Sequence, residues 1–280
     1  MSIFYLYRSD TCRTGIQTQK LFNMYTAAIE KLSRQFIPAD FVVTDWPSLE
    51  PFFKDLLDRT IDTAAALEKW LQDISELEAV VSEDACWRQI KMTCDTENKA
   101  LEEAFNFFCV SIQPNIQPYS DALNKKLVNH PLTANLDKDT YFTYLRSIRK
   151  SIELFREENI PLQSELAVLQ QHFGVITGKM TVTIDGQEYT LQQAAKFLEN
   201  PDRSVREAAY HKIQERRLQD KEPLNELFNQ LIQKRNQEAL NAGFDNYRDF
   251  RFKELGRFDY TKEDCFAFHD AVKKHVLPLV

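Results

Sequence analysis

The residue types that could do chemistry are spread along the chain and do not gather into a motif. Five histidines occur in the 280 residues, and the closest pair, His269 and His275, lies six positions apart. Six steps along a helix turn a side chain by about 240°, so these two cannot share a metal ion. The zinc-binding pattern HExxH, with two histidines four positions apart and a glutamate between them, does not occur. We therefore predict no metal ligand in these residues.

The cysteines and carboxylates also lack the neighbours that a nucleophile or a general base requires. The chain contains no GxSxG, P-loop or GxGxxG pattern. Five scattered cysteines form no CxxC pair, and we interpret them as reduced core thiols: Cys12, Cys86, Cys94, Cys109 and Cys265. Cys94 and Cys109 fall on apolar helix faces, where a buried thiol is inert. We predict no catalytic residue.

Residues 241–261, NAGFDNYRDFRFKELGRFDYT, combine aromatic and charged side chains more densely than the rest of the chain. Gly243 and Gly256 predict helix ends on either side of a short helix, because glycine adopts the left-handed backbone at low cost. Arginines interleaved with rings are typical of nucleic-acid sites. However, four basic residues meet four acidic residues here, so the segment has no net charge. We therefore favour a buried helix with ion pairs over a ligand-binding role.

The composition favours a helical protein over an α/β enzyme. Six glycines are few for 280 residues, and phosphate-cradling loops need more. The formal net charge of −7 argues against binding to nucleic acid or to an anionic membrane. The first ten residues lack the basic start and long apolar run of a signal peptide, and no stretch approaches the ~20 apolar residues of a membrane span. We expect a cytoplasmic location.

Apolar residues recur at helical spacing along most of the chain. We expect helices over residues 18–35, 48–71, 83–108, 120–128, 141–155, 162–173, 190–198, 204–217, 223–232 and 261–276. The stripe over residues 83–108 is broken once by the polar residues Glu97 and Asn98. Ser48 and the pairs Ser204/Glu207, Thr190/Gln193 and Thr261/Asp264 are candidate helix caps. Residues assigned to inward faces include Trp87, Ile90, Phe173, Phe228, Ile232, Phe268 and Val276. Pro114, Pro118 and Pro131 predict a turn region.

One stretch predicts strands. Asp185-Gly186 separates two alternating runs and suits a type I′ hairpin turn, which places Val182 opposite Tyr189 and Ile184 opposite Gln187. One face of this hairpin is apolar, so it should lie on the helical body. The expected fold is mostly α, an elongated multi-helix bundle with one small β-hairpin at about residues 179–191. We predict a helical domain over residues 1–177, and a hairpin with further helices over residues 178–280.

Four segments together resemble a known family. In order they are WPSLEPFFKDLLDR, MTCDTENKALEEAFNFF, GKMTVTIDGQEYTLQQAAKFLENPDRSVREAAYHKI and NAGFDNYRDFRFKELGRFDYT. From about Asp45 to Val280 the chain is similar to the N-terminal half of oligoendopeptidase F-type zinc metallopeptidases, which are relatives of thimet oligopeptidase. The order and spacing of the four segments make the resemblance more specific than any one segment alone.

This resemblance implies a helical body whose deep channel admits short unfolded peptides for hydrolysis. In the complete relative, zinc is held by the HExxH helix and a later glutamate, both downstream of the similar region. None of these ligands can be assigned to this chain, which would supply the channel wall and be inactive by itself. Tyr247, Arg248, Arg251 and Arg257 are the candidate substrate-channel residues. The implied partners are short peptides and a C-terminal catalytic half that brings the zinc.

A second interpretation is a non-catalytic helical interaction module on the same scaffold. An encoding reading frame that continues into HExxH would favour the peptidase, and a stop codon just after Val280 would favour the module. The apolar run VLPLV at residues 276–280 must remain exposed or be covered by another surface. We therefore also expect the isolated chain to self-associate.

Overall fold

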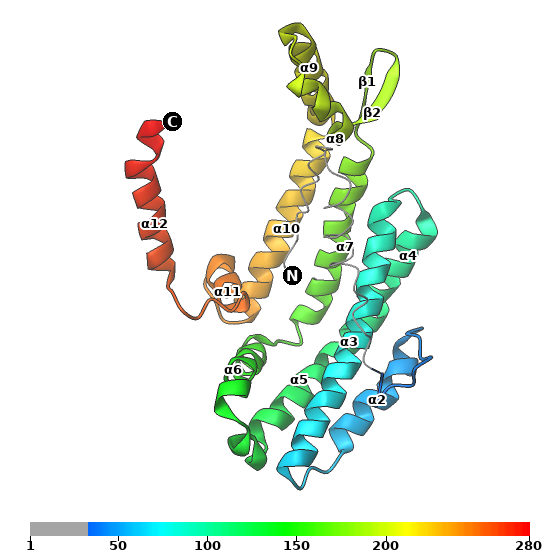
Figure 1. Cartoon of the computed structure of the whole chain (residues 1–280), viewed down its shortest axis with the longest axis vertical. Helices are drawn as coiled ribbons and strands as arrows, with labels where there is room; N and C mark the ends of the chain where they lie inside the picture. The colour runs from blue at the N-terminus through cyan, green and yellow to red at the C-terminus, as the bar shows by residue number, and fades with distance from the viewer. Residues whose placement is uncertain (1–32) are drawn as a thin grey trace, which may run out of the picture.

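The computed structural model describes residues 33–280 and shows an elongated, mostly helical protein (Figure 1). The helix predicted over residues 18–35, apart from residues 33–35, and Cys12 lie outside the described residues. The α-helices are α2 (Trp46–Asp58), α3 (Ala64–Cys94), α4 (Lys99–Phe107), α5 (Gln113–Asn129), α6 (Lys138–Leu154), α7 (Asn159–Gly178), α8 (Leu191–Ala194), α9 (Arg203–Gln219), α10 (Lys221–Asn241), α11 (Tyr247–Glu254) and α12 (Lys262–His275).

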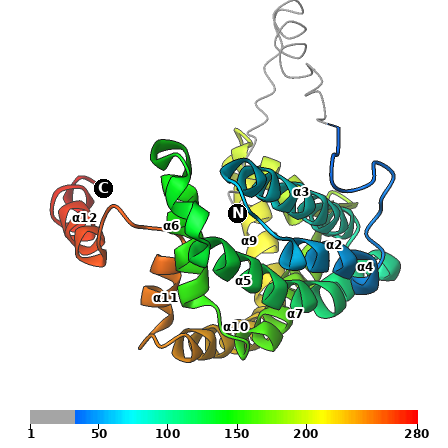
Figure 2. The same cartoon turned by 90° about the horizontal axis from the view of Figure 1, so that it is seen from below.

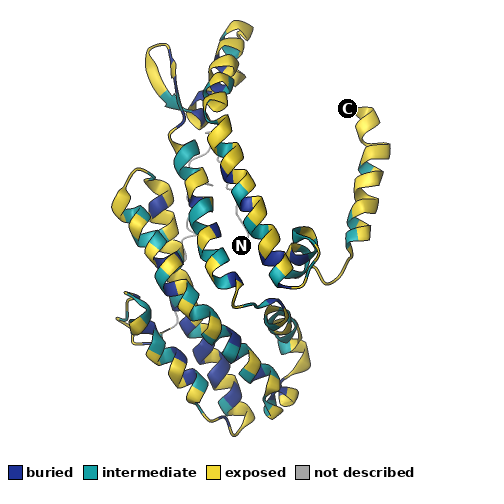
Figure 3. Cartoon of the chain, turned by 180° about the vertical axis from the view of Figure 1, so that it is seen from behind, coloured by how far each residue is buried: buried dark blue, intermediate teal, exposed yellow. Residues whose placement is uncertain are grey.

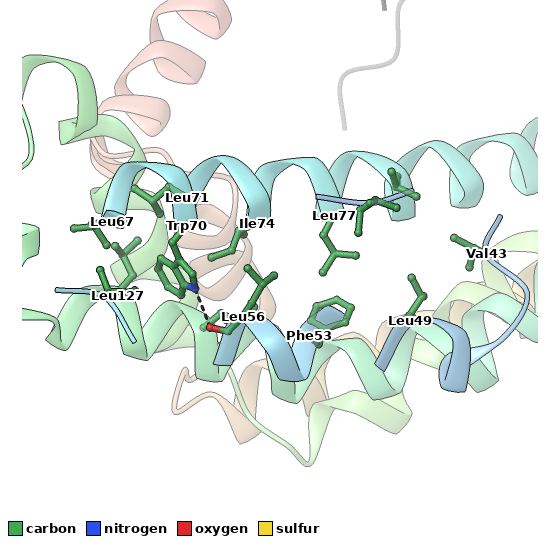
Figure 4. Packing of buried hydrophobic residues seen from close by; sticks show 14 of the residues in the cluster. Val43, Leu49, Phe53, Leu56, Leu67, Trp70, Leu71, Ile74, Leu77 and Leu127 are labelled. Atoms are coloured by element: carbon green, nitrogen blue, oxygen red, sulfur yellow. Dashed lines mark hydrogen bonds between the residues drawn. The ribbon is translucent and has the colours of Figure 1, made fainter. Parts of the chain in front are cut away.

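The largest core lies between α2, α3 and α5. Trp70 of α3 is completely buried there, and its indole Nε1 donates a hydrogen bond to the carbonyl oxygen of Leu56 at 2.8 Å (Figure 4). The same core contains the fully or almost fully buried side chains Leu49, Leu56, Leu67, Leu77, Ile112 and Leu127. Leu49, Phe53 and Leu56 on α2, and Leu67, Trp70, Ile74 and Leu77 on α3, recur at steps of three and four, so each of these helices turns one apolar face toward the core.

The single helix predicted over residues 48–71 is wrong, because two helices occupy this stretch. Helix α2 ends at Asp58, and the Thr63 hydroxyl caps α3 by accepting a hydrogen bond from the backbone N–H of Ala66 at 3.1 Å. The two apolar faces pack against each other, so together they look like one stripe in the sequence. Asp45 is the residue that caps α2, and Ser48 completes a capping box with it.

The predicted turn region around the prolines is mostly helical. A π-helix over Phe108–Ile112 leads directly into α5, which has Pro114 in its first turn and Pro118 inside it. Proline fits the first turn of a helix, because the backbone N–H that it lacks has no intrahelical partner there. Of the three prolines, Pro131 alone marks a turn, since it begins the 3₁₀ helix Pro131–Asn135.

The second half of α3 differs from the predicted inward stripe. Trp87 and Ile90 are exposed, and so are the thiols of Cys86 and Cys94, which are therefore not core residues. Cys109, in the π-helix, is buried, and burial raises the pKa of its thiol to about 11. The interpretation as an inert core thiol thus holds for Cys109 and is wrong for Cys86 and Cys94.

The predicted hairpin is confirmed by strands β1 (Thr181–Ile184) and β2 (Gln187–Thr190). They are antiparallel, with Val182 opposite Tyr189 and Ile184 opposite Gln187. Asp185 and Gly186 have φ angles of 52° and 79°, the left-handed backbone that a type I′ turn needs. Met180, Val182 and Ile184 face the helical body and form a small core with α8 and α9. The hairpin projects beside α9 at one end of the molecule (Figure 1).

Of the three predicted capping boxes, two are confirmed and one is wrong. Capping boxes open α8, with Thr190 and Gln193, and α12, with Thr261 and Asp264. Helix α9 is capped by Asp202, whose carboxylate accepts a hydrogen bond from the N–H of Ser204 at 2.8 Å. Aspartate and serine are both good caps, so spacing alone did not distinguish them.

Helices α7 and α10 pack side by side, and α11 turns across the end of α10 onto α6 (Figures 1 and 2). The left-handed glycines Gly243 and Gly256 close α10 and α11 as predicted, with φ angles of 84° and 67°. Helix α12 stands away from the body and is coloured almost wholly as exposed in Figure 3. Phe268 and Val276 are therefore not inward, and the terminal apolar run is exposed.

Candidate functional site

The predicted channel residues lie on α11 and just beyond it. Tyr247 is half-buried, whereas Arg248, Arg251 and Arg257 are exposed. Arg248 donates to Asp249 at 2.9 Å, and Arg251 pairs with Glu254. The ion pairs proposed from the charge balance therefore form, but they lie at the surface. Phe250 is the one buried residue of α11, so the interpretation of a buried helix is wrong apart from this anchor.

Asp249 ties the start of α12 to α11. Its carboxylate accepts hydrogen bonds from Arg248, from the Asn246 amide at 3.1 Å and from Lys262 of α12 at 3.2 Å. These donors, Arg248 first, hold the pKa of Asp249 far below its ordinary value. The carboxylate therefore stays ionised and keeps its three partners at neutral pH.

Cationic side chains of α6 hold the connection between α11 and α12. The guanidinium of Arg146 lies 4.3 Å from the ring centre of Phe258 and pairs with Asp259 at 3.5 Å. Lys150 donates to the carbonyl oxygen of Glu254 at 2.9 Å. The place from which α12 departs is thus fixed to the body, although α12 itself is exposed.

A groove of about 560 Å³ lies between α7 and α10, next to α11. We call it the α7–α10 groove and define it by its lining residues Gln170, Phe173, Leu224, Phe228, Leu231 and Arg235. Arg235 also stands over the ring of Tyr247, 5.9 Å from its centre. The groove therefore adjoins one of the four predicted channel residues. Arg248, Arg251 and Arg257 do not line it.

The aromatic walls of this groove were not predicted as surface residues. Phe173 and Phe228 are 55% and 58% exposed, although helical spacing assigned both to inward faces, and Ile232 is exposed as well. Leu227 and Leu231 fill the contact with α7, so the apolar stripe on α10 is wider than the surface that α7 covers. The width of this stripe was the signal in the sequence that could have indicated an open apolar surface.

A buried polar cluster closes the other end of the α7–α10 contact. Glu238 accepts a hydrogen bond from the Gln163 amide at 2.8 Å, and the Asn159 amide donates to the backbone carbonyl of Glu238 at 2.9 Å. Burial raises the pKa of Glu238, which outweighs the opposing effects of Gln163 and the cations Arg251 and Arg235. Buried carboxylates of this kind occur in functional and structural sites alike.

This raised pKa predicts a pH-dependent effect of Glu238→Gln. The folded state holds the Glu238 proton at pH values where the unfolded chain has lost it, so the stability that this group contributes falls as pH rises above its ordinary pKa of 4.5. Glutamine keeps the hydrogen-bonding shape without the charge. We expect the variant to have a higher free energy of unfolding than the wild type at pH 7, and an equal one at pH 4, in urea titrations.

The matched control is Glu226→Gln, an exposed carboxylate on the same helix. It should change the stability equally little at both pH values. A Glu238→Gln variant that is less stable than the wild type at pH 7 would show that the ionised carboxylate is favourable in the cluster.

The described residues do not fit a metal site. Within residues 33–280, no three histidine, cysteine, aspartate or glutamate side chains come together in a way that could hold an ion. A zinc site needs three or four such ligands. No chemical step through zinc is therefore assigned to these residues. In the same part of the chain, no helix combines the length and apolarity needed to cross a bilayer.

Two family profiles match the chain on either side of the hairpin. The Peptidase M3 N-terminal domain matches residues 36–155, and Peptidase family M3 matches residues 196–280. The chain belongs to peptidase family M3. The predicted domain boundary between residues 177 and 178 falls in the interval that neither profile covers, and it stays a prediction. No curated protein sequence matches this M3 chain.

Solved structures share the fold of this M3 chain. An oligoendopeptidase F superimposes with a TM-score of 0.79 at 23% identity, covering 86% of this chain and 43% of its own. An oligoendopeptidase F from Bacillus anthracis gives 0.78 at 19% identity, covering 88% and 46%. PZ peptidase A with an inhibitor gives 0.77 at 21% identity, covering 89% and 43%. The M3 chain thus spans less than half the length of these structures, and the predicted fold class is confirmed.

Proposed function

We propose that this M3 chain forms part of the wall of the peptide channel in a metallo-oligoendopeptidase that hydrolyses short peptides. The observation that carries the proposal is the match to both M3 profiles on one chain with an open apolar groove. Members of this family are metallopeptidases and are generally zinc-dependent, and the solved relatives named as oligoendopeptidases support the substrate class.

In this proposal the α7–α10 groove and the α11 arginines face the substrate, and catalysis comes from a polypeptide that carries HExxH. The M3 chain would bind unfolded peptides and exclude folded proteins from the channel. The exposed apolar side chains of α12 and the residues that follow it support a covering partner, since Phe268 and Leu279 are 67% and 86% exposed. The proposed partners are thus short peptides and the catalytic polypeptide, in the cytoplasm.

The test is an activity assay with metal analysis. We expect the purified 280-residue chain to bind no stoichiometric zinc and to leave a quenched fluorescent peptide intact, because HExxH is absent from its sequence. Co-expression with an HExxH-bearing catalytic segment of an M3 relative should restore cleavage, and a chelator should abolish it.

The catalytic segment expressed alone is the control. Chelator-sensitive cleavage by the 280-residue chain alone would show that it has its own ligand set. A catalytic segment that gains neither activity nor peptide selectivity from this chain would remove the channel role and leave the non-catalytic module as the better interpretation.

A further inference from the structure

The α7–α10 groove has an apolar middle and one cationic end. Leu224, Phe228, Leu231 and Arg235 follow each other at steps of four, three and four residues, so they lie along one face of α10. On a helix, the eleven positions from Leu224 to Arg235 span ~16 Å. An extended peptide of about five residues has the same length. The groove therefore matches a short peptide in length.

Two rings give the middle of the groove its character. Phe173 of α7 and Phe228 of α10 both line it and are both more than half exposed. Covering aromatic surface with an apolar side chain is favourable by ~25 cal/mol per Å² of surface removed from water. This part of the groove suits one large apolar side chain.

Among the described residues that line the groove, Arg235 is the only arginine, and its guanidinium forms no hydrogen bond or ion pair with a described carboxylate. Other arginines nearby are paired, Arg248 with Asp249 and Arg251 with Glu254. Within residues 33–280, Arg235 donates no hydrogen bond and forms no ion pair; its contact is the ring of Tyr247. The other charged groups that act electrostatically on the surroundings of Arg235 and Tyr247 are Glu238, Arg251 and Glu254. Free N–H donors arranged in a planar fork bind a carboxylate in a bidentate manner.

We propose that the α7–α10 groove binds the C-terminal end of a short peptide, with its terminal carboxylate on Arg235 and a large apolar side chain between Phe173 and Phe228. Arg235 and Phe228 are seven positions apart on α10, or ~10 Å. That distance corresponds to about three residues of extended chain, so the apolar residue stands three positions before the C-terminus. This assignment rests on the proposed peptide-channel function. It specifies that the groove recognises a terminal carboxylate and an apolar side chain three positions before it.

Tyr247 is a positioning residue in this arrangement. Its ring holds the guanidinium of Arg235, and burial, the largest influence, raises the pKa of its hydroxyl, so the ring stays uncharged at neutral pH. This contact gives one of the four predicted channel residues a definite role.

The experiment measures binding of fluorescein-labelled peptides to the 280-residue chain by fluorescence polarisation. The probe is Gly-Phe-Ala-Ala-Ala with a free C-terminus. It is compared with the same peptide as a C-terminal amide, and with a peptide amide whose last residue is glutamate. We expect the free acid to bind about three- to tenfold more tightly than the plain amide, as for a partly exposed charge-assisted pair. Added salt should reduce the difference in affinity between the free acid and the amide.

Variants then locate the contact. Arg235→Gln should remove the preference for the acid and leave binding of the amide unchanged. Arg217→Gln, an exposed arginine of α9 outside the groove, is the matched control and should keep the preference. Phe228→Ala should weaken binding of the free acid and of the amide by an equal factor, since both peptides make the apolar contact. Tyr247→Phe should keep the preference, and Tyr247→Ala should reduce it.

Four results would overturn the proposal. Equal binding of acid and amide by the wild type would refute the carboxylate contact while leaving the peptide-channel function in place. An amide ending in glutamate that binds as tightly as the free acid would move the recognition to an acidic side chain. Loss of the preference in Arg217→Gln would place the contact elsewhere. Absence of all peptide binding, with self-association that Phe228→Glu abolishes, would assign the groove to a second copy. The co-expression assay would then decide the function independently.

Discussion

Replacing Trp70 with alanine is expected to lower the free energy of unfolding by about 4 kcal/mol. The side chain is completely buried among α2, α3 and α5, and its Nε1–H satisfies the carbonyl oxygen of Leu56 at 2.8 Å. Alanine removes the largest fully buried side chain of this core, leaves a cavity, and leaves the Leu56 carbonyl with the Lys126 ammonium as its remaining side-chain donor. Urea denaturation followed by circular dichroism measures the change.

Trp87→Ala is the matched control, because Trp87 lies on the same helix and is 53% exposed. It should change the stability by no more than about 0.5 kcal/mol. Equal losses for the two variants would show that α3 buries both of its faces, and the assignment of its core face would be wrong.

Local signals in the sequence predicted those parts of the fold in which a few neighbouring residues determine the backbone. The Asp185-Gly186 turn needs two left-handed residues and fixes the register of the hairpin by itself. The Thr261/Asp264 capping box likewise starts a helix with hydrogen bonds between residues three apart. Both features depend on neighbours in sequence, so they could be predicted without tertiary information.

Periodicity failed where the outcome depends on which helix covers which face. The stripe over residues 48–71 is equally compatible with one long helix and with two helices that fold back on each other, and the cap at Thr63 distinguishes them only once the break is suspected. Phe228 shares the apolar face of α10 with Leu227, but α7 covers only Leu227. Spacing shows which residues share a face and does not show how much of that face has a partner.

The candidate site was predictable in part for the same reason. Aromatic and cationic residues around α11 were visible as a cluster, and Tyr247 does contact Arg235 of the groove. Arg235 was not selected, because it lies between the apolar stripe predicted over residues 223–232 and the aromatic and charged cluster over residues 241–261. Its lack of an acidic partner within residues 33–280 is a property of the folded surroundings, where the nearby carboxylates are engaged by other groups.

Lys126→Met is the second large effect, with an expected loss of about 2–3 kcal/mol in the free energy of unfolding. The Lys126 ammonium donates to three carbonyl oxygens at the end of α2, those of Leu56 at 3.1 Å, Leu57 at 2.7 Å and Arg59 at 2.6 Å. It thereby hydrogen-bonds to backbone carbonyl groups of the kind that every helix leaves unpaired at its C-terminus. Methionine keeps the aliphatic stem, but the carbonyls of Leu57 and Arg59 lose this donor and that of Leu56 keeps the Trp70 indole alone. Each lost bond to a charged donor is costly.

Lys91→Met, an exposed lysine on α3, is the control and should give no measurable change. A double variant with Trp70→Phe tests the mechanism further, because Lys126 and Trp70 share the Leu56 carbonyl and the ammonium lies 5.4 Å from the indole ring centre. The combined loss should be larger than the sum of the two single losses, since each donor still satisfies the Leu56 carbonyl when the other is removed, and the double variant leaves it with neither. Strict additivity would mean that the two donors stabilise α2 independently of each other.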